Sequence, residues 1–204
     1  RRVLFRSDDE GPTISGMPAS FTMTNDADQC GGTATWEEPT SSDNCAVASL
    51  LPDLPNGSFL AVGDTTIMYT STDVTGHVAT ASFTVTVLDD QNPEFLVAPE
   101  SQVLDSDPGQ CGAIASWDAA VTGDNCEVLS LQSSHSSGEF FAEGTTDVTL
   151  TLTDSHTNVT THVFSITVND VEPPELLDMP ISIIQTADPG LCGAIVSWTP
   201  PGTS

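Results

Sequence analysis

The chain has 204 residues, with 29 Asp and Glu against 3 Lys and Arg, so its formal net charge at pH 7 is −26. A surface this acidic repels nucleic-acid phosphates and anionic lipid headgroups, which excludes both as direct partners. A hydrophobic fraction of 38% supports a packed core, so the charge indicates solubility or cation binding rather than disorder. The apolar stretches are only a handful of residues long, and we expect no membrane insertion.

An internal repeat with a period of 81 residues organises the chain. Cys30, Cys111 and Cys192 recur at this spacing, and an equally spaced tryptophan follows each of them by six residues. A fixed period of this kind indicates tandem structural units. We therefore expect the final strand and linker of a preceding repeat at 1–10, complete repeats at 11–91 and 92–172, and an incomplete third repeat at 173–204. This division favours the interpretation that the sequence is a stretch of a longer tandem chain.

Each repeat has the pattern of short, half-buried strands. Apolar residues alternate with Thr or Ser at 83–87, 148–152 and 164–168, and Ile67 and Tyr69 alternate with the Thr and Met residues at 66, 68 and 70. Together with the turns rich in Gly, Pro, Asn and Asp, this alternation predicts an all-β fold with one small antiparallel β-sandwich per repeat. The linkers at 89–93 and 170–174 are acidic and contain proline, so we expect stiff joints and a rod-like array.

The five cysteines follow the same period. Cys30 and Cys45 are 15 residues apart, as are Cys111 and Cys126, whereas Cys192 has no such partner within this segment. A metal site would need closer Cys or Cys/His pairs, so we predict the disulfides Cys30–Cys45 and Cys111–Cys126 and an unpaired Cys192. Disulfides imply an oxidising compartment, hence a secreted or cell-surface protein. The two Asn-x-Ser/Thr sequons, at Asn56 and Asn158, are candidate N-glycosylation sites.

A set of ordered motifs resembles the hyalin repeat (HYR) family. The motifs in the second repeat are the cysteine-centred run 107–117, Asp124-Asn125-Cys126, 144–148 and Thr153-Asp154, and the first repeat has the same frame. The resemblance covers both full copies and the start of the third, and it implies an immunoglobulin-like β-sandwich of extracellular proteins with adhesion or matrix roles. The second cysteine pair frequent in the family is absent here, since Met17, Ala98 and Met179 occupy its first position.

The sequence shows no catalytic pattern. The four histidines, His77, His135, His156 and His162, do not recur in register, and no nucleophile or phosphate-binding motif is present. We therefore expect a protein that is not an enzyme and requires no cofactor.

Periodic acidic residues at the joints make Ca²⁺ a candidate ligand, because this ion prefers clustered oxygen atoms. A simple solvated surface is the alternative interpretation. Asp43 and Asp124 are interpreted as turn residues that present the following cysteine. The candidate Ca²⁺ ligands are Asp8, Asp9, Glu10, Asp89, Asp90, Asp170 and Glu172.

The periodic tryptophans, Trp36, Trp117 and Trp198, are expected to pack in the core against the disulfides, with carbohydrate stacking as the alternative. The predicted function is an extracellular structural or adhesive segment of a fibre, matrix or surface appendage. Its partners would be neighbouring repeats or copies of the same protein, with glycans as a further candidate. The alternative is a Ca²⁺-dependent module that binds a glycan or protein through loops at the ends of the sandwiches.

Overall fold

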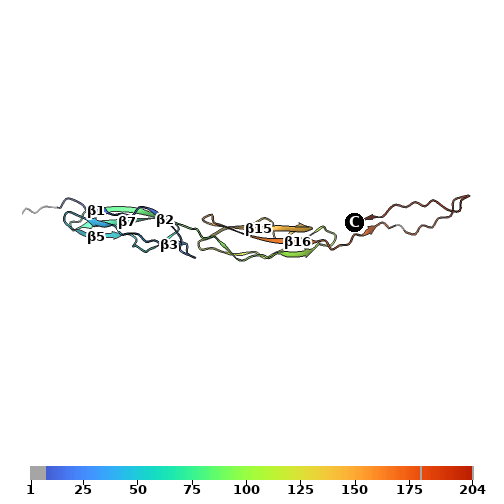
Figure 1. Cartoon of the computed structure of the whole chain (residues 1–204), viewed down its shortest axis with the longest axis horizontal. Helices are drawn as coiled ribbons and strands as arrows, with labels where there is room; N and C mark the ends of the chain where they lie inside the picture. The colour runs from blue at the N-terminus through green and yellow to red at the C-terminus, as the bar shows by residue number, and fades with distance from the viewer. Residues whose placement is uncertain (1–7, 180, 204) are drawn as a thin grey trace, which may run out of the picture. The chain divides into compact units, whose positions relative to one another are not determined.

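The computed structural model describes residues 8–179 and 181–203 (Figure 1). The secondary structure in this part of the chain consists of β-strands. The expected strand around Val3–Phe5 lies outside the described residues. The described residues form two compact units, the first with 8–99, 118–135 and 149–163, and the second with 100–117, 136–148 and the described residues from 164 onward. The described chain contains no helix long and apolar enough to cross a membrane.

The first repeat is a β-sandwich built mainly from antiparallel strands. A four-stranded sheet has the order β2-β8-β7-β5, and β3–β6 and β1–β4 form two further pairs. The pair β2–β8 is parallel, which the alternation did not predict, whereas the other pairings are antiparallel. The strands are β1 (Thr13–Ser15), β2 (Phe21–Thr24), β3 (Gly31–Thr33), β4 (Thr40–Ser42), β5 (Val47–Pro52), β6 (Phe59–Ala61), β7 (Gly63–Asp73) and β8 (Val78–Leu88).

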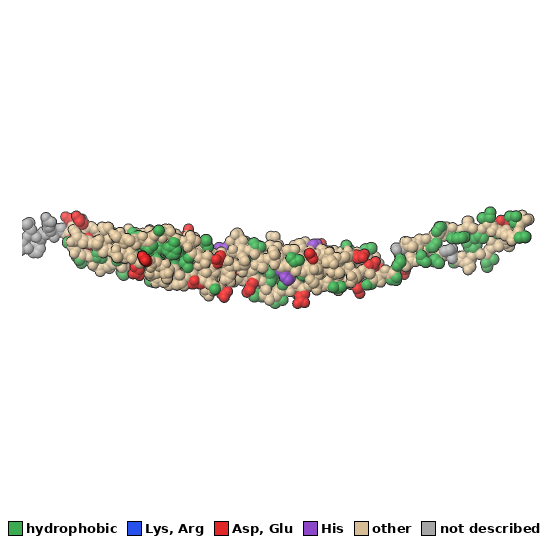
Figure 2. Space-filling view, viewed as in Figure 1, with side chains coloured by type: hydrophobic (Ala, Val, Ile, Leu, Met, Phe, Trp, Pro, Cys, Tyr) green, Lys and Arg blue, Asp and Glu red, His purple; other side chains and the backbone are tan. Residues whose placement is uncertain are grey.

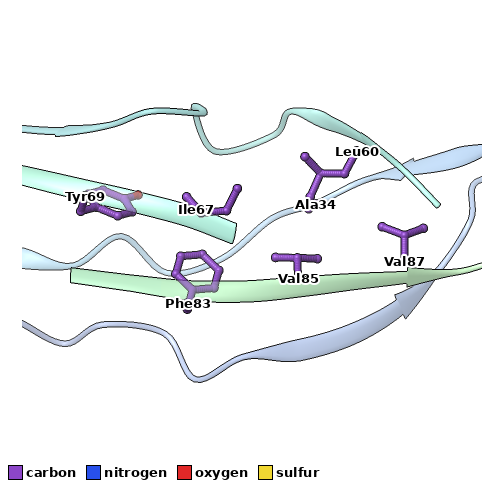
Figure 3. Close-up of a cluster of buried hydrophobic side chains, with 7 residues drawn as sticks. All are labelled: Ala34, Leu60, Ile67, Tyr69, Phe83, Val85 and Val87. Carbon is purple, nitrogen blue, oxygen red and sulfur yellow. The ribbon is translucent and has the colours of Figure 1, made fainter. Parts of the chain in front are cut away.

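The core of this sandwich follows from the alternation along β7 and β8. Ile67, Val85 and Val87 are fully buried, and the Thr residues between them are more exposed. β-branched side chains suit such a half-buried pleated surface. Figure 3 shows the cluster of Ala34, Leu60, Ile67, Tyr69, Phe83, Val85 and Val87.

Trp36 packs at the edge of this core, as predicted, but on aromatic rings. Its ring meets Phe83 edge-on at a centroid distance of 5.3 Å, and its Nε1 donates a hydrogen bond of 2.9 Å to the Tyr69 hydroxyl. A tryptophan whose ring is packed and whose N–H is paired serves the core, which argues against a sugar-stacking role for Trp36.

The second repeat has the same strand order. Its sheet runs β10-β16-β15-β13, with the pairs β11–β14 and β12–β9. In the second unit, Trp117 contacts Phe164 and Phe141 edge-on at 5.2 and 6.1 Å, which repeats the packing of Trp36. The strands are β9 (Glu94–Val97), β10 (Gln102–Asp105), β11 (Gly112–Ala115), β12 (Val121–Gly123), β13 (Val128–Ser133), β14 (Glu139–Ala142), β15 (Gly144–Asp154) and β16 (Val159–Asn169).

Beyond the second repeat, the described residues contain the short antiparallel pair β17 (Leu176–Leu177) and β18 (Gly202–Thr203). Apolar side chains are exposed here, including Ile184 at 97% and Trp198 at 61% (Figure 2). The prediction of a core tryptophan is therefore wrong for Trp198. This segment corresponds to the first strands of a repeat, and a counterpart of the four-stranded sheet that covers such side chains is absent from its described residues.

A buried carboxylate shapes the turn between β7 and β8. Asp73 Oδ1 accepts hydrogen bonds from the backbone N–H groups of Thr75, Gly76 and His77, and Asp73 Oδ2 contacts His77 Nδ1 at 2.9 Å. Burial alone would raise the pKa of the Asp73 carboxyl, but the hydrogen bonds from His77 and Thr75 outweigh burial and hold this pKa well below its usual range. The hydrogen bond to Asp73, together with the nearby charges of Asp73, Asp8 and Asp9, raises the pKa of His77 despite its partial burial.

The substitution Ile67→Ala tests the core of the first sandwich. It removes a fully buried side chain from the centre of β7 and should lower the free energy of unfolding by about 2–5 kcal/mol. Thr66→Ala is the matched control on the same strand, because Thr66 is exposed, and it should change stability by at most about 0.5 kcal/mol. Urea denaturation followed by tryptophan fluorescence measures both, and equal losses would contradict this core.

The substitution His77→Asn tests the pH dependence of the Asp73 turn. Asn158 occupies the equivalent position in the second repeat, so the variant keeps a neutral hydrogen-bond donor. Because folding raises the pKa of His77, its charge stabilises the fold fully below the ordinary value of 6.5, and this stability is lost as the pH rises through the folded value.

Asp73 behaves in the opposite sense, since its lowered pKa gives stability that is present above 3.8 and is lost as the pH falls through the folded value. The variant should therefore be less stable than the parent at pH 5, and the difference should disappear at pH 9. Denaturation at both pH values measures this, and an equal loss at each pH would refute the ionic contribution.

Candidate functional site: the joint between the first two repeats

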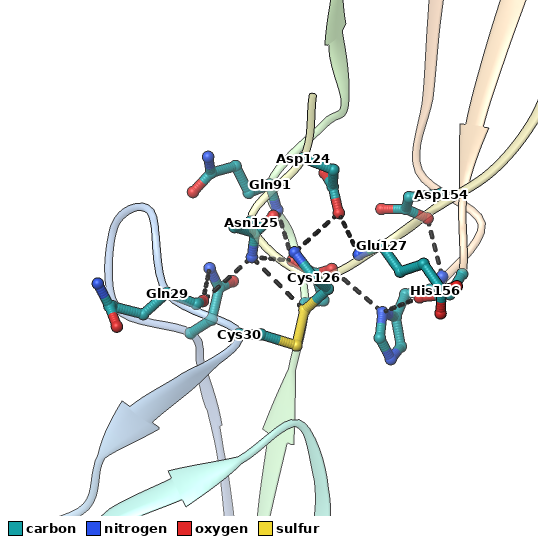
Figure 4. Close-up of a disulfide and its surroundings, with 12 residues drawn as sticks. Gln29, Cys30, Gln91, Asp124, Asn125, Cys126, Glu127, Asp154 and His156 are labelled. Atoms are coloured by element: carbon teal, nitrogen blue, oxygen red, sulfur yellow. Dashed lines mark hydrogen bonds and ion pairs between the residues drawn. A yellow bond between two sulfur atoms is a disulfide. The ribbon is translucent and has the colours of Figure 1, made fainter. Parts of the chain in front are cut away.

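The first two repeats are covalently linked within the first unit. Cys30 forms a disulfide with Cys126, with 4.6 Å between the two Cα atoms and a sequence separation of 96 residues (Figure 4). The predicted pairs Cys30–Cys45 and Cys111–Cys126 are therefore wrong. We call the linker 88–93, together with the turns at 25–30, 124–127 and 154–158, the joint.

The length of strand β7 explains why the predicted pairs do not form. Cys30 directly precedes β3, whose first residue pairs with Ala61, just before β7 begins at Gly63. Cys45 precedes β5, whose first residue pairs with Asp73 at the other end of β7. The eleven residues of β7 span roughly 33 Å, whereas a disulfide needs Cα atoms within about 7 Å. The 15-residue spacing thus connects opposite ends of one sandwich.

Side-chain amides connect the same two turns that the disulfide joins. Asn125 Nδ2 donates to the Gln29 carbonyl at 3.1 Å and to Asp89 Oδ1 at 3.0 Å. The linker residue Gln91 accepts the Asp28 backbone N–H at 2.9 Å and donates to the Asp28 carboxylate at 3.1 Å. The bridge is therefore embedded in hydrogen bonds between the first repeat, the linker and the second repeat.

The turn after β15 holds the linker from the side of the second repeat. Asp89 has a fully buried side chain, and its Oδ2 lies 3.1 Å from His156 Nδ1. Asn158 Nδ2 lies 3.2 Å from the carbonyl oxygens of Asp89 and Gln91 and 2.7 Å from Asp154 Oδ2. His156 and Asn158, which have no counterparts of the same type in the first repeat, are therefore structural residues of this joint.

Three carboxylates converge beside the disulfide. Asp89, Asp124 and Asp154 each place an oxygen within 4.8 Å of the others. Asp124 Oδ2 accepts the backbone N–H groups of Cys126 and Glu127 at 2.9 Å, whereas the buried Asp124 Oδ1 and Asn125 Oδ1 have no hydrogen-bond partner. Buried oxygen atoms without donors are ones that a hard cation such as Ca²⁺ could use.

The equivalent residues gather again at the start of the first repeat. Asp8 lies in a group with Asp43 and Cys45 and in another with Asp73 and His77. The buried Asp8 Oδ2 and Asp43 Oδ1 also lack hydrogen-bond partners. The equivalent carboxylates thus gather around Asp8, one period before Asp89, but in two groups rather than in one group of three.

The structure brings together only part of the predicted Ca²⁺ set. Asp8 and Asp89 belong to the carboxylate groups, whereas Asp9, Glu10, Asp90, Asp170 and Glu172 are in none of the ligand groups found among the described residues. Asp90 instead donates its backbone N–H to Asn25, Asp170 accepts the N–H of Glu172, and the Glu172 carboxylate accepts the Gly109 N–H.

Sequence reasoning missed Asp73 and Asp154 as members of these groups and assigned Asp43 and Asp124 only to turns. The turn role is correct, since Asp43 Oδ2 accepts the Cys45 N–H at 2.8 Å. The other oxygen of each carboxylate has no hydrogen-bond partner, and both residues belong to the carboxylate groups as well. Their recurrence in step with Asp8 and Asp89 was the signal that could have identified them.

Both candidate glycosylation sites have engaged amides. Asn56 Nδ2 donates to the Trp36 carbonyl at 2.6 Å. Asn158 Nδ2 serves three acceptors in the joint, and a glycan would replace one of its two N–H groups. This competition disfavours a glycan at Asn158.

Three exposed cysteines, Cys45, Cys111 and Cys192, are free thiols. A hydrogen bond with Asp8, followed by burial and the charges of nearby carboxylates, raises the pKa of the Cys45 thiol. A thiol with a raised pKa is a weaker nucleophile at neutral pH.

Comparison with known proteins places this geometry in a family. A family model described as HYR domain matches residues 7–87 and 88–168. Hyalin from Strongylocentrotus purpuratus is 28% identical over 201 residues, which cover 95% of this chain and 17% of that protein. Hyalin from Lytechinus variegatus is 27% identical over 198 residues, covering 95% of this chain and 37% of that protein.

Among solved structures, Drosophila N-cadherin EC1-4 matches 80% of this chain and 50% of its own, with a TM-score of 0.36 and 14% identity. Fibronectin(III)-like modules of Clostridium thermocellum CbhA match 79% of this chain and 97% of their own, with a TM-score of 0.29 and 12% identity. The two tandem family matches and the hyalin relatives over most of the chain show that it belongs to the HYR, or hyalin repeat, family.

Proposed function

We propose that this chain is a non-enzymatic, extracellular structural and adhesive segment of a fibre, matrix or surface appendage. The observation that carries the proposal is the Cys30–Cys126 disulfide, which joins one repeat to the next. Such a covalent bond keeps the two repeats connected at their boundary even when the hydrogen bonds of the joint break. A disulfide also fits an oxidising location outside the cell.

The proposed partners are neighbouring repeats, as at the first joint, and other copies of the same protein. The described part of the chain carries Asp and Glu but neither Lys nor Arg (Figure 2). Two copies therefore repel each other until salt or a divalent cation screens their charge. Contact between copies should accordingly depend on ionic strength.

Bead aggregation tests the adhesive role. Beads coated with the oxidised chain, its free thiols capped by iodoacetamide, should aggregate at 0.15 M salt, where the screening length is about 8 Å, and less at 0.01 M, where it is about 30 Å. The double variant Cys30→Ser with Cys126→Ser should lose about 2–5 kcal/mol of stability and aggregate less.

The matched control is Cys111→Ser with Cys192→Ser, which removes two cysteines and leaves the bridge intact. Light scattering measures aggregation, and circular dichroism verifies folding. Failure of the folded, oxidised chain to aggregate at any salt concentration would refute adhesion between copies.

The carboxylate groups support a second candidate function, a Ca²⁺-dependent module. In the joint, Asp89, Asp124 and Asp154 would supply carboxylate oxygens and Asn125 a carbonyl oxygen. Water molecules or neighbouring carbonyls would complete the six to eight ligands that Ca²⁺ takes. The ion would offset the mutual repulsion of the three carboxylates and tighten the boundary.

A thermal melt with Ca²⁺ and with chelator tests this candidate. At a Ca²⁺ concentration 100 times the dissociation constant, binding should stabilise the fold by about 2.7 kcal/mol and raise the melting midpoint. Asp124→Asn, which keeps a hydrogen-bond acceptor, should abolish most of this shift. Asp90→Asn is the control, because Asp90 is exposed and outside the group. Identical midpoints with Ca²⁺ and chelator at physiological salt would eliminate the site.

A further inference from the structure

We propose that Cys45 and Cys111 are half-sites for the same disulfide at the adjacent repeat boundaries. Cys45 would bond to the first cysteine of a hyalin repeat on its N-terminal side, and Cys111 to the second cysteine of one on its C-terminal side. A disulfide would then recur at every boundary, in step with the 81-residue period. The inference rests on the proposed tandem structural role and adds the residues that join each repeat to its neighbours.

The loop that carries Cys111 has the same structure as the loop that carries Cys30. The Gln29 N–H donates to the Asp26 carbonyl at 3.0 Å, and the Gln110 N–H donates to the Asp107 carbonyl at 2.9 Å. The N–H of the same aspartate also donates to the carbonyl of the glycine that follows the cysteine, Gly31 in the first loop and Gly112 in the second, at 2.7 Å in both.

The linker that follows each repeat holds this loop in the same way. Gln91 accepts the N–H of Asp28, and Glu172, one period later, accepts the N–H of Gly109 at 3.0 Å. Asp28 and Gly109 also share a left-handed backbone conformation, with φ of 59° and 72°. The Cys111 loop is therefore already in the conformation that carries the bridged cysteine at the first joint.

The turn that carries Cys45 matches the turn that carries Cys126. Asp43 Oδ2 accepts the Cys45 N–H at 2.8 Å, and Asp124 Oδ2 accepts the Cys126 N–H at 2.9 Å. Asp8 lies in one group with Asp43 and in another with Asp73, whereas the equivalent Asp89 lies in a single group with Asp124 and Asp154. Cys45 thus has the surroundings of the bridged Cys126, whereas its own thiol is exposed and free.

Neither thiol can be bridged within its own repeat. Cys45 lies at the opposite end of the first sandwich from Cys30, and both Cys30 and Cys126 are already in the observed bond. The partner must therefore come from another repeat, where the observed joint shows the geometry it adopts.

Each bond forms by thiol–disulfide exchange. Two thiols lose two electrons and two protons to become a disulfide, and a disulfide oxidant, such as oxidised glutathione, is reduced to two thiols. The first thiolate attacks the oxidant, one thiol leaves, and the second cysteine displaces the other. The oxidant is the only further reactant.

An extended chain tests the Cys45 half-site. In this chain, residues 1–7 are replaced by a copy of residues 8–88 that carries Cys45→Ser. The last residue of the copy then directly precedes Asp8, which is equivalent to Asp89, so the copy stands as the preceding repeat in the correct register. After refolding with oxidised and reduced glutathione, the first cysteine of the copy should bond to Cys45, leaving only Cys111 and Cys192 as thiols. Thiol titration should then give two thiols per chain. Four thiols in a folded chain would overturn the proposal.

The control is the same extended chain with Cys45→Ser also at the original position, which should show three thiols. Peptide mapping without reduction should find Cys45 linked to the first cysteine of the copy in the extended chain that retains Cys45, and this cysteine of the copy as a free thiol in the control. Circular dichroism verifies that the chains are folded. Bead aggregation uses the chain without this extension, so failure of the bridge and failure of adhesion are separate results.

A second extension tests Cys111. A copy of residues 124–169 is fused after Ser204, which is equivalent to Gly123, and Cys192→Ser removes the competing thiol. Oxidation should link Cys111 to the cysteine of the copy and leave Cys45 as the one thiol. Three thiols in the folded protein would overturn the proposal for Cys111.

Discussion

The length of strand β7 constrains where a repeat can be crosslinked. The strand runs from Gly63 to Asp73 and keeps the loop of Cys30 and the turn of Cys45 at opposite ends of the sandwich. A cysteine at one end can therefore meet only a cysteine from outside its own sandwich. The Cys30–Cys126 bond satisfies this requirement, and the hydrogen bonds of the joint form around it.

The Asp73 turn and the joint show how buried carboxylates are accommodated without a Lys or Arg partner among the described residues. Burying a carboxylate costs free energy unless donors compensate it. Asp73 and Asp154 receive backbone N–H groups from their own turns, and Asp89 receives the side chains of Asn125 and His156. Amide groups and an imidazole thus provide the hydrogen bonds that guanidinium and ammonium groups usually donate to buried carboxylates.

The alternation of apolar residues and threonine predicted much of the fold. Strands β7, β8, β15 and β16 follow it directly, because a sheet with one buried face repeats every two residues. The spacing of the tryptophans likewise predicted the core roles of Trp36 and Trp117. Trp198 differs, because the covering sheet has no counterpart among the described residues around it.

The site was harder to predict for a reason inherent in repeats. A periodic sequence offers each cysteine a partner within its repeat and an equivalent one in the next, and sequence spacing favours the nearer of the two. Only the pairing of β3 with β6 and of β5 with β7 shows that the nearer partner lies at the far end. Asp154 was missed for a similar reason, since it is distant in sequence from the predicted ligand Asp89 and meets it only when the turn after β15 reaches the linker.

The position of the bridge has a mechanical consequence. When the chain is pulled from both sides, the shortest covalent path leaves the first repeat at Cys30 and enters the second at Cys126. Strands β5, β7 and β8 lie in the bypassed loop and bear no tension along their backbone. With a sequence separation of 96 residues, the bond withholds about 300 Å of extended chain, so the core of the first sandwich cannot be drawn out while the bond is intact.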